Sequence, residues 1–510
     1  MPRYAAIDIG SNSIRMLAAE VVAGAPFQNL ASARQVTRLG ESVFRTGRVS
    51  QGAIDLCCNV LAQMAAEYRA VGVVGIRAVG TSALRDASNQ DEFLERASKA
   101  LEAPVEVISG QEEARLIHLG VQSRWPHPTQ RVLIVDIGGG SAELILSERG
   151  RMTQAFSKQL GALRLKEVFL KRDPPDPREL RRMEEYIEER IVDAVRRFGR
   201  APYDRAIATS ATAAAIICAV NRVPRAKRET ADRLKATAPQ VKKFYAQVST
   251  HDLESRQRIP GIGPKRAEII VPGAALLMQA LREFHLAKLY YSAAGLRDGI
   301  IADLASRGVG RELSRLDDEQ RRLMTAMTRR YGVPLRHARK VAEIAHTLFD
   351  SLQSLHTLPP AYGKALEAAA YLHDAGHYVS DTRHHRHSHY LVENSDMPGF
   401  TGRERRLVAN LCRYHRKSPP SPAHSQYQAL DAEARRAVLL LTPLLRLADA
   451  LDRSNEQRVE SLECQVRDAE VIVRIGSGAD ADLEQWAGET VTGLFREVYG
   501  KRLVIAKARP

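Results

Sequence analysis

Two short segments of this 510-residue chain carry residue types that bind phosphate groups. Residues 8–13 read Asp-Ile-Gly-Ser-Asn-Ser, and residues 136–141 read Asp-Ile-Gly-Gly-Gly-Ser. Glycines and small hydroxyl side chains let backbone N–H groups close on an anion, while the Asp holds a metal ion or a water molecule beside it. The residues expected around the phosphate are Asp8, Gly10, Ser11, Asn12 and Ser13 in the first segment, and Asp136, Gly138, Gly139, Gly140 and Ser141 in the second.

The context of the two segments is the same. Each lies between two short apolar runs, which predicts a strand, a tight turn and a second strand. Two ordinary hairpin turns are the alternative interpretation. Because the pattern occurs twice in matched contexts, we favour two similar loops that face each other and clamp a phosphate group.

A pair of glutamates between the two loops could supply the reaction. Glu112 and Glu113 stand in the first turn of a predicted helix. The dipole at a helix N-terminus favours carboxylates, so a simple helix start is one interpretation. The other is that one of the two activates a water molecule for in-line attack on phosphorus. Phosphoryl transfer asks the protein mainly for positioning, a base and charge neutralisation.

Other charged residues near the loops are candidates for metal and phosphate contacts. Asp8 and Asp136 could hold a magnesium ion or its water molecules, and Glu143 projects from the strand that follows the second loop. Arg85 lies at a predicted turn into a helix, where its guanidinium group could clamp phosphate oxygens. As a surface arginine it would be unremarkable.

The elements that must position these residues alternate between strand and helix over the first 300 residues. In the first half, after the first loop, we expect a helix over 50–71, a strand over 72–79, a helix ending near 101, a strand over 105–108 and a helix ending near 121. In the second half we expect helices around 163–170 and 176–197, a strand and turn over 205–212, a helix over 269–283, a strand over 288–292 and a helix over 295–306. This order predicts two α/β domains of related topology with a cleft between them.

From about residue 313 the pattern becomes helical. No strand-like run is clear before 465–475, and eleven of the fifteen histidines lie beyond residue 330. We therefore expect four domains with a linker near 307–311. Their predicted boundaries are 1–122, 123–306, 311–460 and 461–510.

The composition restricts the class of partner. The formal charge of +15 and a pI near 9.7 favour a polyanion, which could be nucleic acid, an acidic membrane surface or a phosphate polymer. Aromatic residues make up only 5%, and no basic strand is interleaved with aromatics, so we expect phosphate recognition and no nucleic acid.

Cysteines and apolar stretches indicate the compartment. The five cysteines form no C-x-x-C pair and fit reduced, mostly buried thiols. A strand is expected from residue 4, which leaves no room for a signal peptide, and the apolar stretches are too short to span a membrane. We expect a cytoplasmic protein without a transmembrane segment, and leave peripheral association with a membrane open.

Several ordered motifs resemble the exopolyphosphatase/guanosine pentaphosphate phosphatase (Ppx/GppA) family. The segments that carry the resemblance are 6–15, 81–89, 107–117, 135–143, 161–165, 266–275 and 295–299. It extends into the helical region and so covers nearly the whole chain. The resemblance implies an α/β fold of two actin/sugar-kinase-like (ribonuclease H-like) domains that act as a hydrolase, followed by a helical HD-like domain and a small C-terminal α+β domain. It also implies a homodimer.

The resemblance assigns roles residue by residue. Glu113 matches the catalytic base, and Asp136 and Glu143 match the carboxylates that hold magnesium and position water. Arg85 and Arg266 match arginines on the substrate side. The positions matching the phosphate-binding loops are Asn12, Ser13, Gly138, Gly139 and Ser141.

One segment departs from the family pattern. Residues 208–213 read Ala-Thr-Ser-Ala-Thr-Ala where the family has a glycine-rich turn. Lost glycines restrict close approach of the backbone to a ligand. This difference argues against a nucleotide-base pocket at the turn and favours a simple phosphate chain.

The histidine-rich region contains a candidate metal site. His337, His373, Asp374 and Asp449 have the order and rough spacing of an HD-type site, in which imidazoles and carboxylates from neighbouring helices bind one or two divalent ions. An inherited scaffold with satisfied histidines is the alternative.

Basic residues crowd the same region, at 383–389 and 413–417. They could form a track for the distal part of a long polyphosphate, and a solvated surface is the simpler interpretation.

The leading hypothesis is an exopolyphosphatase that releases orthophosphate from chain ends, with Glu113 as base and magnesium as cofactor. A monovalent ion such as K⁺ and a further divalent metal in the HD-like domain are additional candidates. The closest alternative converts guanosine pentaphosphate (pppGpp) to the tetraphosphate. A kinase or ATPase of the actin-like superfamily and a non-catalytic sensor of polyphosphate or alarmone are more distant alternatives.

Overall fold

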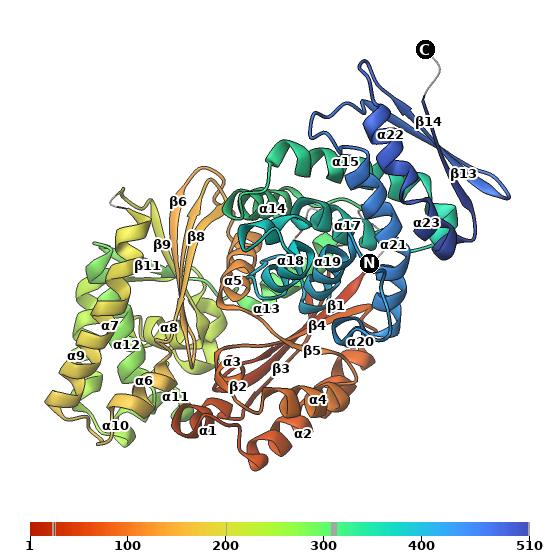
Figure 1. The fold of residues 1–510 in the computed structure, drawn as a ribbon. Coiled ribbons are helices and arrows are strands. Elements are labelled where there is room, and N and C mark those ends of the chain that lie inside the picture. The colour runs from red at the N-terminus through yellow and green to blue at the C-terminus, as the bar shows by residue number, and fades with distance from the viewer. Residues whose placement is uncertain (23–24, 26, 200, 308–313, 508–510) are drawn as a thin grey trace. The chain divides into compact units, whose positions relative to one another are not determined.

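The computed structural model describes residues 1–22, 25, 27–199, 201–307 and 314–507. The chain forms two compact units, Met1–Val309 and Gly310–Pro510 (Figure 1). The linker expected at 307–311 lies, from residue 308 on, outside the described residues. The finer division of each unit, at 122/123 and at 460/461, stays a prediction.

The first unit begins with a five-stranded sheet in the order β3-β2-β1-β4-β5. Its first three strands are antiparallel neighbours, whereas β1, β4 and β5 run parallel. The strands are β1 (Arg3–Ile9), β2 (Ser13–Glu20), β3 (Gln28–Val36), β4 (Gly75–Gly80) and β5 (Val105–Val107). The helices that accompany them are α1 (Leu39–Thr46), α2 (Gln51–Ala70), α3 (Ser82–Asp86), α4 (Gln90–Leu101) and α5 (Gly110–Arg124).

The second sheet of this unit repeats the first. Its order, β8-β7-β6-β9-β11, has the same antiparallel and parallel pairings, with β10 added at the edge. The strands are β6 (Arg131–Ile137), β7 (Ala142–Glu148), β8 (Arg151–Lys158), β9 (Arg205–Thr209), β10 (Lys235–Thr237) and β11 (Lys288–Tyr291). The predicted α/β fold with two halves of related topology, as in an actin-like fold, is confirmed within this one unit.

Helices cover the second sheet. They are α6 (Ala162–Phe169), α7 (Pro177–Phe198), α8 (Ser210–Val220), the 3-10 helix η1 (Arg225–Ala231), α9 (Ala238–Thr250), α10 (Leu253–Gln257), α11 (Pro264–Ala267) and α12 (Ile270–Glu283). The last helix of the unit, α13 (Leu296–Arg307), packs instead against β1, β2 and β4 of the first sheet. Figure 1 shows α7, α9 and α12 side by side along one face of this sheet. The core beneath them is apolar, and most of the buried residues of α12 belong to it.

Helices α5 and α13 pack at glycine contacts. A Cβ on Gly299 would lie 1.7 Å from the carbonyl oxygen of Leu116, and one on Gly120 would lie 2.1 Å from that of Gly295. Only glycine permits such an approach of two backbones. The contact fixes the position of α5, the helix that carries Glu113 in its first turn.

The apolar pattern of the sequence does not predict two of the edge strands. β3 and β8 complete the two sheets, yet both are largely exposed or half-buried and lack a continuous apolar pattern. The segment expected as a strand and turn over 205–212 is strand β9 followed directly by helix α8. Apolar periodicity finds buried strands and misses half-exposed ones.

The second unit is mainly helical, as predicted. Its helices are α14 (Asp318–Arg330), α15 (Leu335–Ser351), α16 (Gln353–His356), α17 (Ala361–Leu372), the 3-10 helix η2 (Ala375–Tyr378), α18 (His384–Glu393), α19 (Gly402–Tyr414), α20 (Ser425–Gln428), α21 (Ala432–Ala450), α22 (Asp482–Glu489) and α23 (Thr492–Tyr499). A small sheet in the order β12-β13-β14 ends it, with strands β12 (Ser461–Val466), β13 (Glu470–Gly476) and β14 (Arg502–Lys507). The single strand-like run expected at 465–475 is therefore most of a hairpin.

Two further expectations concern thiols and membranes. All five cysteines are unpaired, and three of them are buried, as predicted. Within the described residues, every helix is too short or too polar to cross a membrane.

Candidate active site

The two Asp-Gly segments form matching hairpins. In the first, the backbone N–H of Gly10 donates to the carbonyl oxygen of Ser13 at 3.2 Å. In the second, Gly138 and Ser141 make the same bond at 3.0 Å. The first loop joins β1 to β2 and the second joins β6 to β7, which confirms the strand, turn and strand expected from the apolar runs.

The two loops meet at one cavity of about 340 Å³. A Cβ on Gly139 would lie 3.2 Å from the backbone nitrogen of Asn12, so the loop tips approach closely. The predicted residues that line the cavity are Asp8, Gly10, Ser11, Asn12, Ser13, Glu113, Asp136, Gly138, Gly139, Gly140, Ser141 and Arg266. The expectation of two loops that face each other agrees with this arrangement.

Glu113 and Glu112 have different environments. Ser109 caps α5 by accepting a hydrogen bond from the backbone nitrogen of Glu112 at 3.2 Å. The side chain of Glu113 reaches the cavity, whereas that of Glu112 accepts hydrogen bonds from Arg115 at 2.7 and 2.9 Å. Glu112 thus belongs to a buried ion-pair network, and Glu113 is the member of the pair that can meet a substrate.

Arg85 holds Glu113 instead of lining the cavity. Its Nη1 donates to Oε2 of Glu113 and to the carbonyl oxygen of Ile108, both at 2.9 Å. Burial raises the pKa of Glu113, against the lowering effect of Arg85. A carboxylate in this position is oriented, and its raised pKa makes it a stronger proton acceptor than a free glutamate side chain. The contact of Arg85 with phosphate oxygens stays a prediction.

Three more carboxylates lie close to Glu113. Burial raises the pKa of Asp8, raises that of Asp136 to about 7 and raises that of Glu143 well above its usual value. For Asp136 and Glu143, repulsion from neighbouring carboxylates adds to the effect. A cation bound among these carboxylates would favour their charged forms, which burial alone disfavours.

Glu143 offers an oxygen suited to a cation or its water. The side chain is fully buried on the strand position paired with Asp136, and its Oε1 accepts a hydrogen bond from Ser157 at 2.8 Å. Its Oε2 is buried and has no hydrogen-bond partner in the described part of the chain. The oxygen donors of Asp136 and Glu143 therefore fit a hard divalent ion such as Mg²⁺.

Arginines form the other part of the cavity lining. Those with side chains at the cavity are Arg15, Arg34, Arg228, Arg266 and Arg297. Burial, together with repulsion from neighbouring arginines, lowers the pKa of Arg34 to about 10 and that of Arg266 well below its usual value. Arg228 and Arg266 are held by hydrogen bonds to Ala211 and Thr212. This concentration of positive charge is built to receive an anion.

Sequence reasoning found only Arg266 of these five. Arg15 had a usable signal, because it lies two residues after Ser13 on the strand that leaves the first loop. Arg34 comes from β3, Arg228 from η1 and Arg297 from α13. Arg297 lies within the recognised motif 295–299, but no role was assigned to it. Only the fold brings Arg34 and Arg228 to the same cavity, so no local pattern could identify those two.

The altered turn begins helix α8 at the cavity wall. Ser210 has φ 94°, in the region that favours glycine, so its backbone keeps the conformation although the glycine is absent. Its hydroxyl oxygen accepts hydrogen bonds from the backbone nitrogens of Thr212 and Ala213 at 3.2 and 3.4 Å. The helix start is thus capped by its own side chain.

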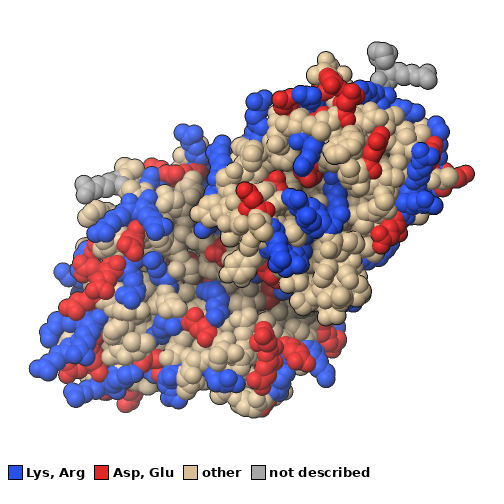
Figure 2. All heavy atoms as spheres, viewed as in Figure 1, with Lys and Arg blue, Asp and Glu red and all other residues tan. Residues whose placement is uncertain are grey.

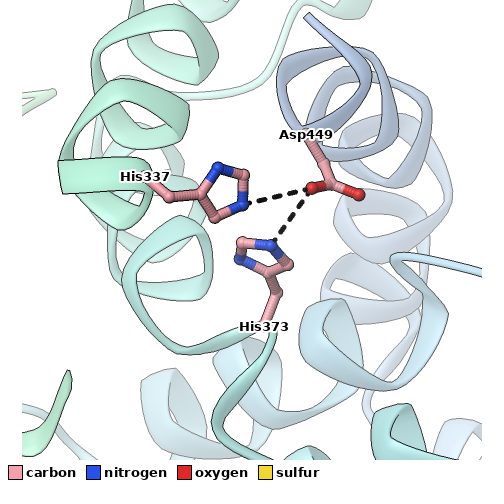
Figure 3. A group of neighbouring side chains, drawn as sticks. All are labelled: His337, His373 and Asp449. Carbon is pink, nitrogen blue, oxygen red and sulfur yellow. Dashed lines mark ion pairs between the residues drawn. The ribbon is translucent and has the colours of Figure 1, made fainter. Parts of the chain in front are cut away.

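The predicted HD-type residues come together in the second unit. Figure 3 shows His337, His373 and Asp449 pointing toward one another from three different segments. Oδ1 of Asp449 lies 3.5 Å from Nε2 of His337 and 3.4 Å from Nε2 of His373. We call these three residues the first histidine group. Asp374 lies beside it, with Oδ2 3.6 Å from Nε2 of His373.

The basic clusters of the second unit are only partly surface features. Within 383–389, His384, His385 and His389 are buried. On the face shown in Figure 2, Lys and Arg side chains are scattered among Asp and Glu instead of forming one continuous stripe. The polyphosphate track over this region stays a prediction.

Comparisons with known proteins agree with the site. Residues 17–307 match the Ppx/GppA phosphatase family, and residues 320–482 match domain III of Ppx/GppA phosphatases. The crystal structure of the Aquifex aeolicus member of the Ppx/GppA family is 28% identical, with a TM-score of 0.53, over 60% of this chain and 98% of its own. The crystal structure of an exopolyphosphatase from Cytophaga hutchinsonii is 25% identical, with a TM-score of 0.54, over 59% of this chain and 96% of its own. With more than half of its length matched by the first family description alone, the chain belongs to the Ppx/GppA phosphatase family.

Proposed function

We propose that this phosphatase is a magnesium-dependent exopolyphosphatase that releases orthophosphate from the ends of inorganic polyphosphate. The observation that carries the proposal is the set of five arginines in one cavity with Glu113, Asp136 and the two glycine loops. Such a cavity supplies more positive charge than one phosphate monoester needs. A chain of linked phosphates matches it in charge and in length.

The second cavity of the first unit extends the same surface. It has a volume of about 290 Å³ and shares Arg34, Arg228 and Arg266 with the first cavity. Arg225 and Lys265 line it as well. These shared arginines would hold the phosphates that follow the terminal one, so the chain would leave the site through the second cavity.

Glu113 has the position of the general base. Its carboxylate takes a proton from a water molecule, and the water oxygen forms a bond to the terminal phosphorus. The bond from that phosphorus to the bridging oxygen breaks, and the shortened chain leaves with the electron pair of the broken bond. Arg85 keeps the carboxylate in place throughout.

Magnesium fits the carboxylates beside the loops. Asp136 and Glu143 would hold the ion, and Asp8 would hold its water molecules. When bound, the ion would neutralise charge on the phosphate oxygens. The arginines of the cavity would neutralise the remaining charge along the chain.

The closest alternative is hydrolysis of guanosine pentaphosphate by the same residues. A nucleotide would also need a pocket for its base and ribose. Ser210 already satisfies the N–H groups of Thr212 and Ala213 at the turn where a glycine-rich backbone would approach such a ligand. This self-capping favours the polymer. It argues in the same way against an ATPase or kinase.

The test compares substrates on one preparation of the full chain. We expect kcat/KM with Mg²⁺ to be higher for long polyphosphate than for guanosine pentaphosphate, and we expect no steady turnover of ATP. Equal or greater efficiency on the nucleotide would overturn the proposal in favour of the alternative. Binding of polyphosphate without release of phosphate would instead indicate a sensor.

A further inference from the structure

Asp374 lies between two groups of imidazoles in the second unit. The first histidine group is on one side of it. On the other side, Asp374, His377 and His384 offer ligand atoms that all lie within 4.8 Å of one another. We call these three residues the second histidine group. The spacing of the sequence does not select His377 or His384 as ligands.

The two oxygens of Asp374 face different groups. Oδ2 lies 3.6 Å from Nε2 of His373, in the first group. Oδ1 lies 3.4 Å from Nε2 of His384 and 3.5 Å from Nε2 of His415. His377 completes the second side, with its Nε2 at 3.7 Å from Oδ1. A carboxylate that turns one oxygen to each of two ligand sets has the arrangement of a bridging metal ligand.

The ring nitrogens that face inward are lone-pair donors. Nδ1 of His373 lies 2.9 Å from the carbonyl oxygen of Ala370, and Nδ1 of His415 lies 2.8 Å from that of Cys412. A carbonyl oxygen only accepts, so each Nδ1 carries the hydrogen and each Nε2 of the neutral ring carries a lone pair. Such outward bonds fix the tautomer of metal-binding histidines.

The lone pair of His373 faces carboxylate oxygens, and that of His415 faces a ring nitrogen of His384. Nε2 of His373 is buried and makes no hydrogen bond with the described residues, yet carboxylate oxygens lie within 3.6 Å of it. Nε2 of His384 and Nε2 of His415 are 3.2 Å apart, with Nη1 of Arg416 at 3.4 Å from the former. Repulsion between the His373 nitrogen and the carboxylate oxygens disappears when a cation lies between them. The contact of His384 with His415 can be a ring hydrogen bond, and the same two nitrogens can instead bind one ion.

The cluster of both groups opens into a cavity of about 520 Å³. Arg416, Lys417 and Arg453 line this cavity, which adds positive charge beyond the ligands themselves. Trp486 also lines it and is 63% exposed. Cations suit a phosphate group, and an exposed indole ring offers a stacking surface for a flat aromatic ring.

We propose that the second unit holds two divalent metal ions bridged by Asp374, and that this centre hydrolyses phosphoesters that carry an aromatic ring, such as nucleotides. The first ion would bind the first histidine group and Asp374. The second would bind Asp374 and the imidazoles of His377, His384 and His415. Ligand sets rich in imidazole favour first-row transition metals over magnesium.

The reaction would be a hydrolysis. A water molecule loses a proton to solvent at the centre, and its oxygen forms a bond to phosphorus. The ester P–O bond breaks, and the leaving oxygen takes up a proton. This activity is separate from polyphosphate hydrolysis and does not rest on it, because none of its residues belongs to the first unit.

Metal content tests the centre without any assay of activity. The full chain, freed of metal and then reloaded with Mn²⁺, should retain about two ions after gel filtration beyond any ion held by Asp136 and Glu143 of the first unit, and the counts below refer to these two. The D374N variant removes the bridge and should retain at most one, and the H415Q variant should retain one. The matched control is H387Q, which changes a histidine of α18, the helix that carries His384, but one that belongs to neither group; it should retain both ions.

Circular dichroism and polyphosphate hydrolysis of each variant establish that it is folded. Wild-type protein that retains no Mn²⁺ under these conditions would overturn the proposal. Folded D374N and H415Q that retained as much metal as wild type would overturn it as well.

Activity tests the second part of the proposal. Bis(p-nitrophenyl) phosphate and p-nitrophenyl phosphate serve as aromatic phosphoester probes with Mn²⁺. We expect hydrolysis that falls about 100-fold in D374N and is unchanged in E113Q. Loss in E113Q with retention in D374N would place the activity in the first unit and refute the second site. Retained metal without hydrolysis of either probe would refute the catalytic part.

Discussion

The β1–β2 and β6–β7 hairpins have the same backbone but differ in charge at one position. On the strand after the first loop, Arg15 pairs with Asp8. On the strand after the second, Glu143 occupies the equivalent place and pairs with Asp136. The first hairpin therefore sets a cation beside its carboxylate, and the second sets another carboxylate there. One strand position is enough to make a duplicated loop asymmetric, with one copy suited to phosphate oxygens and the other to a metal ion.

A helix start supports each loop in the same way. This support therefore does not explain why the two hairpins differ in charge. Near the start of α1, the backbone nitrogen of Gly40 donates to the carbonyl oxygen of Ser11 at 2.7 Å. Near the start of α6, that of Leu163 donates to the carbonyl oxygen of Gly139 at 2.9 Å. In both cases a helix N-terminus satisfies a loop carbonyl. The charge at the paired strand position is what distinguishes the hairpins.

The test with the largest expected effect asks whether polyphosphate is still hydrolysed when the two hairpins have no base between them. In E113Q the loops, the arginines and the metal carboxylates remain, but the proton acceptor is gone. We expect kcat for polyphosphate to fall about 10³-fold, within the usual range for loss of a general base, while KM changes little. Initial-rate kinetics with Mg²⁺ measure both.

The matched control for this variant is E95Q, an exposed glutamate on α4 that should leave both constants unchanged. Retention of a tenth or more of the wild-type rate in E113Q would mean that the two hairpins and their ion suffice. The assignment of Glu113 as base would then be wrong.

The next test removes the charge that makes the second hairpin a metal site. In E143Q the side chain keeps its size but loses its charge, so Asp136 faces the ion alone. We expect about a 100-fold loss of kcat at low Mg²⁺ and partial recovery at high Mg²⁺, as for weakened metal coordination. A titration of rate against Mg²⁺ concentration measures the shift.

Glu148 provides the comparison for that titration. It lies on the same strand β7 but pairs with Arg131 at 2.7 Å, away from the loop, so E148Q should follow the wild-type Mg²⁺ curve. An unchanged curve in E143Q would show that the second hairpin does not differ from the first in metal binding.

The residues of the two loops and the candidate base could be predicted from the sequence. Both loops, Glu113, Asp136 and Glu143 lie in short motifs within or beside predicted strands and helix starts, so local patterns identify them. Which of Glu112 and Glu113 faces the cavity depends on the packing of α5 against α13, which rests on Gly120 and Gly299. In this case the residue-by-residue resemblance pointed to the glutamate that the structure places at the cavity.

The arginines show where local patterns stop. Arg34 lies on a half-exposed edge strand, and Arg297 lies in a helix some 260 residues later in the chain. Their meeting depends on the relative placement of the two sheets, which no short pattern encodes. For Arg85 the motif was recognised from the sequence, but its hydrogen bonds to Glu113 and Ile108 were not predicted.

A smaller effect is expected from the first hairpin. In R15Q the phosphate side loses one positive charge, while four arginines remain in the cavity. We expect KM for polyphosphate to rise about tenfold with little change in kcat, and the dependence of binding on salt to weaken by roughly one ion. The exposed Arg151 on β8 gives a control, R151Q, with neither change. If R15Q behaved like E143Q, with a shifted Mg²⁺ requirement, the charge at this strand position would not assign phosphate binding to one hairpin and metal binding to the other.

The smallest predicted effect concerns what packs behind each hairpin. Ser147 of β7 lies 2.9 Å from Nε2 of His118 and 2.8 Å from Nε2 of His127, whereas the equivalent place on β2 is Ala19. Burial, together with repulsion from His127 and Arg115, lowers the pKa of His118 to about 4. The folded state thus holds this ring neutral, while the unfolded chain protonates it near its ordinary value of about 6.5.

Stability from this ring should therefore be complete above about pH 7 and lost as the pH falls from about 6.5 toward 4. Urea unfolding should show that wild type loses about 1 kcal/mol more than H118Q between roughly pH 7.5 and 5.5. All other titrating groups are common to the two proteins and cancel in the difference. Parallel curves would mean that the ring is protonated in the folded state as readily as in the unfolded one. In that case the second hairpin would differ from the first only in the charge of Glu143, and not in what the far end of its strand packs against.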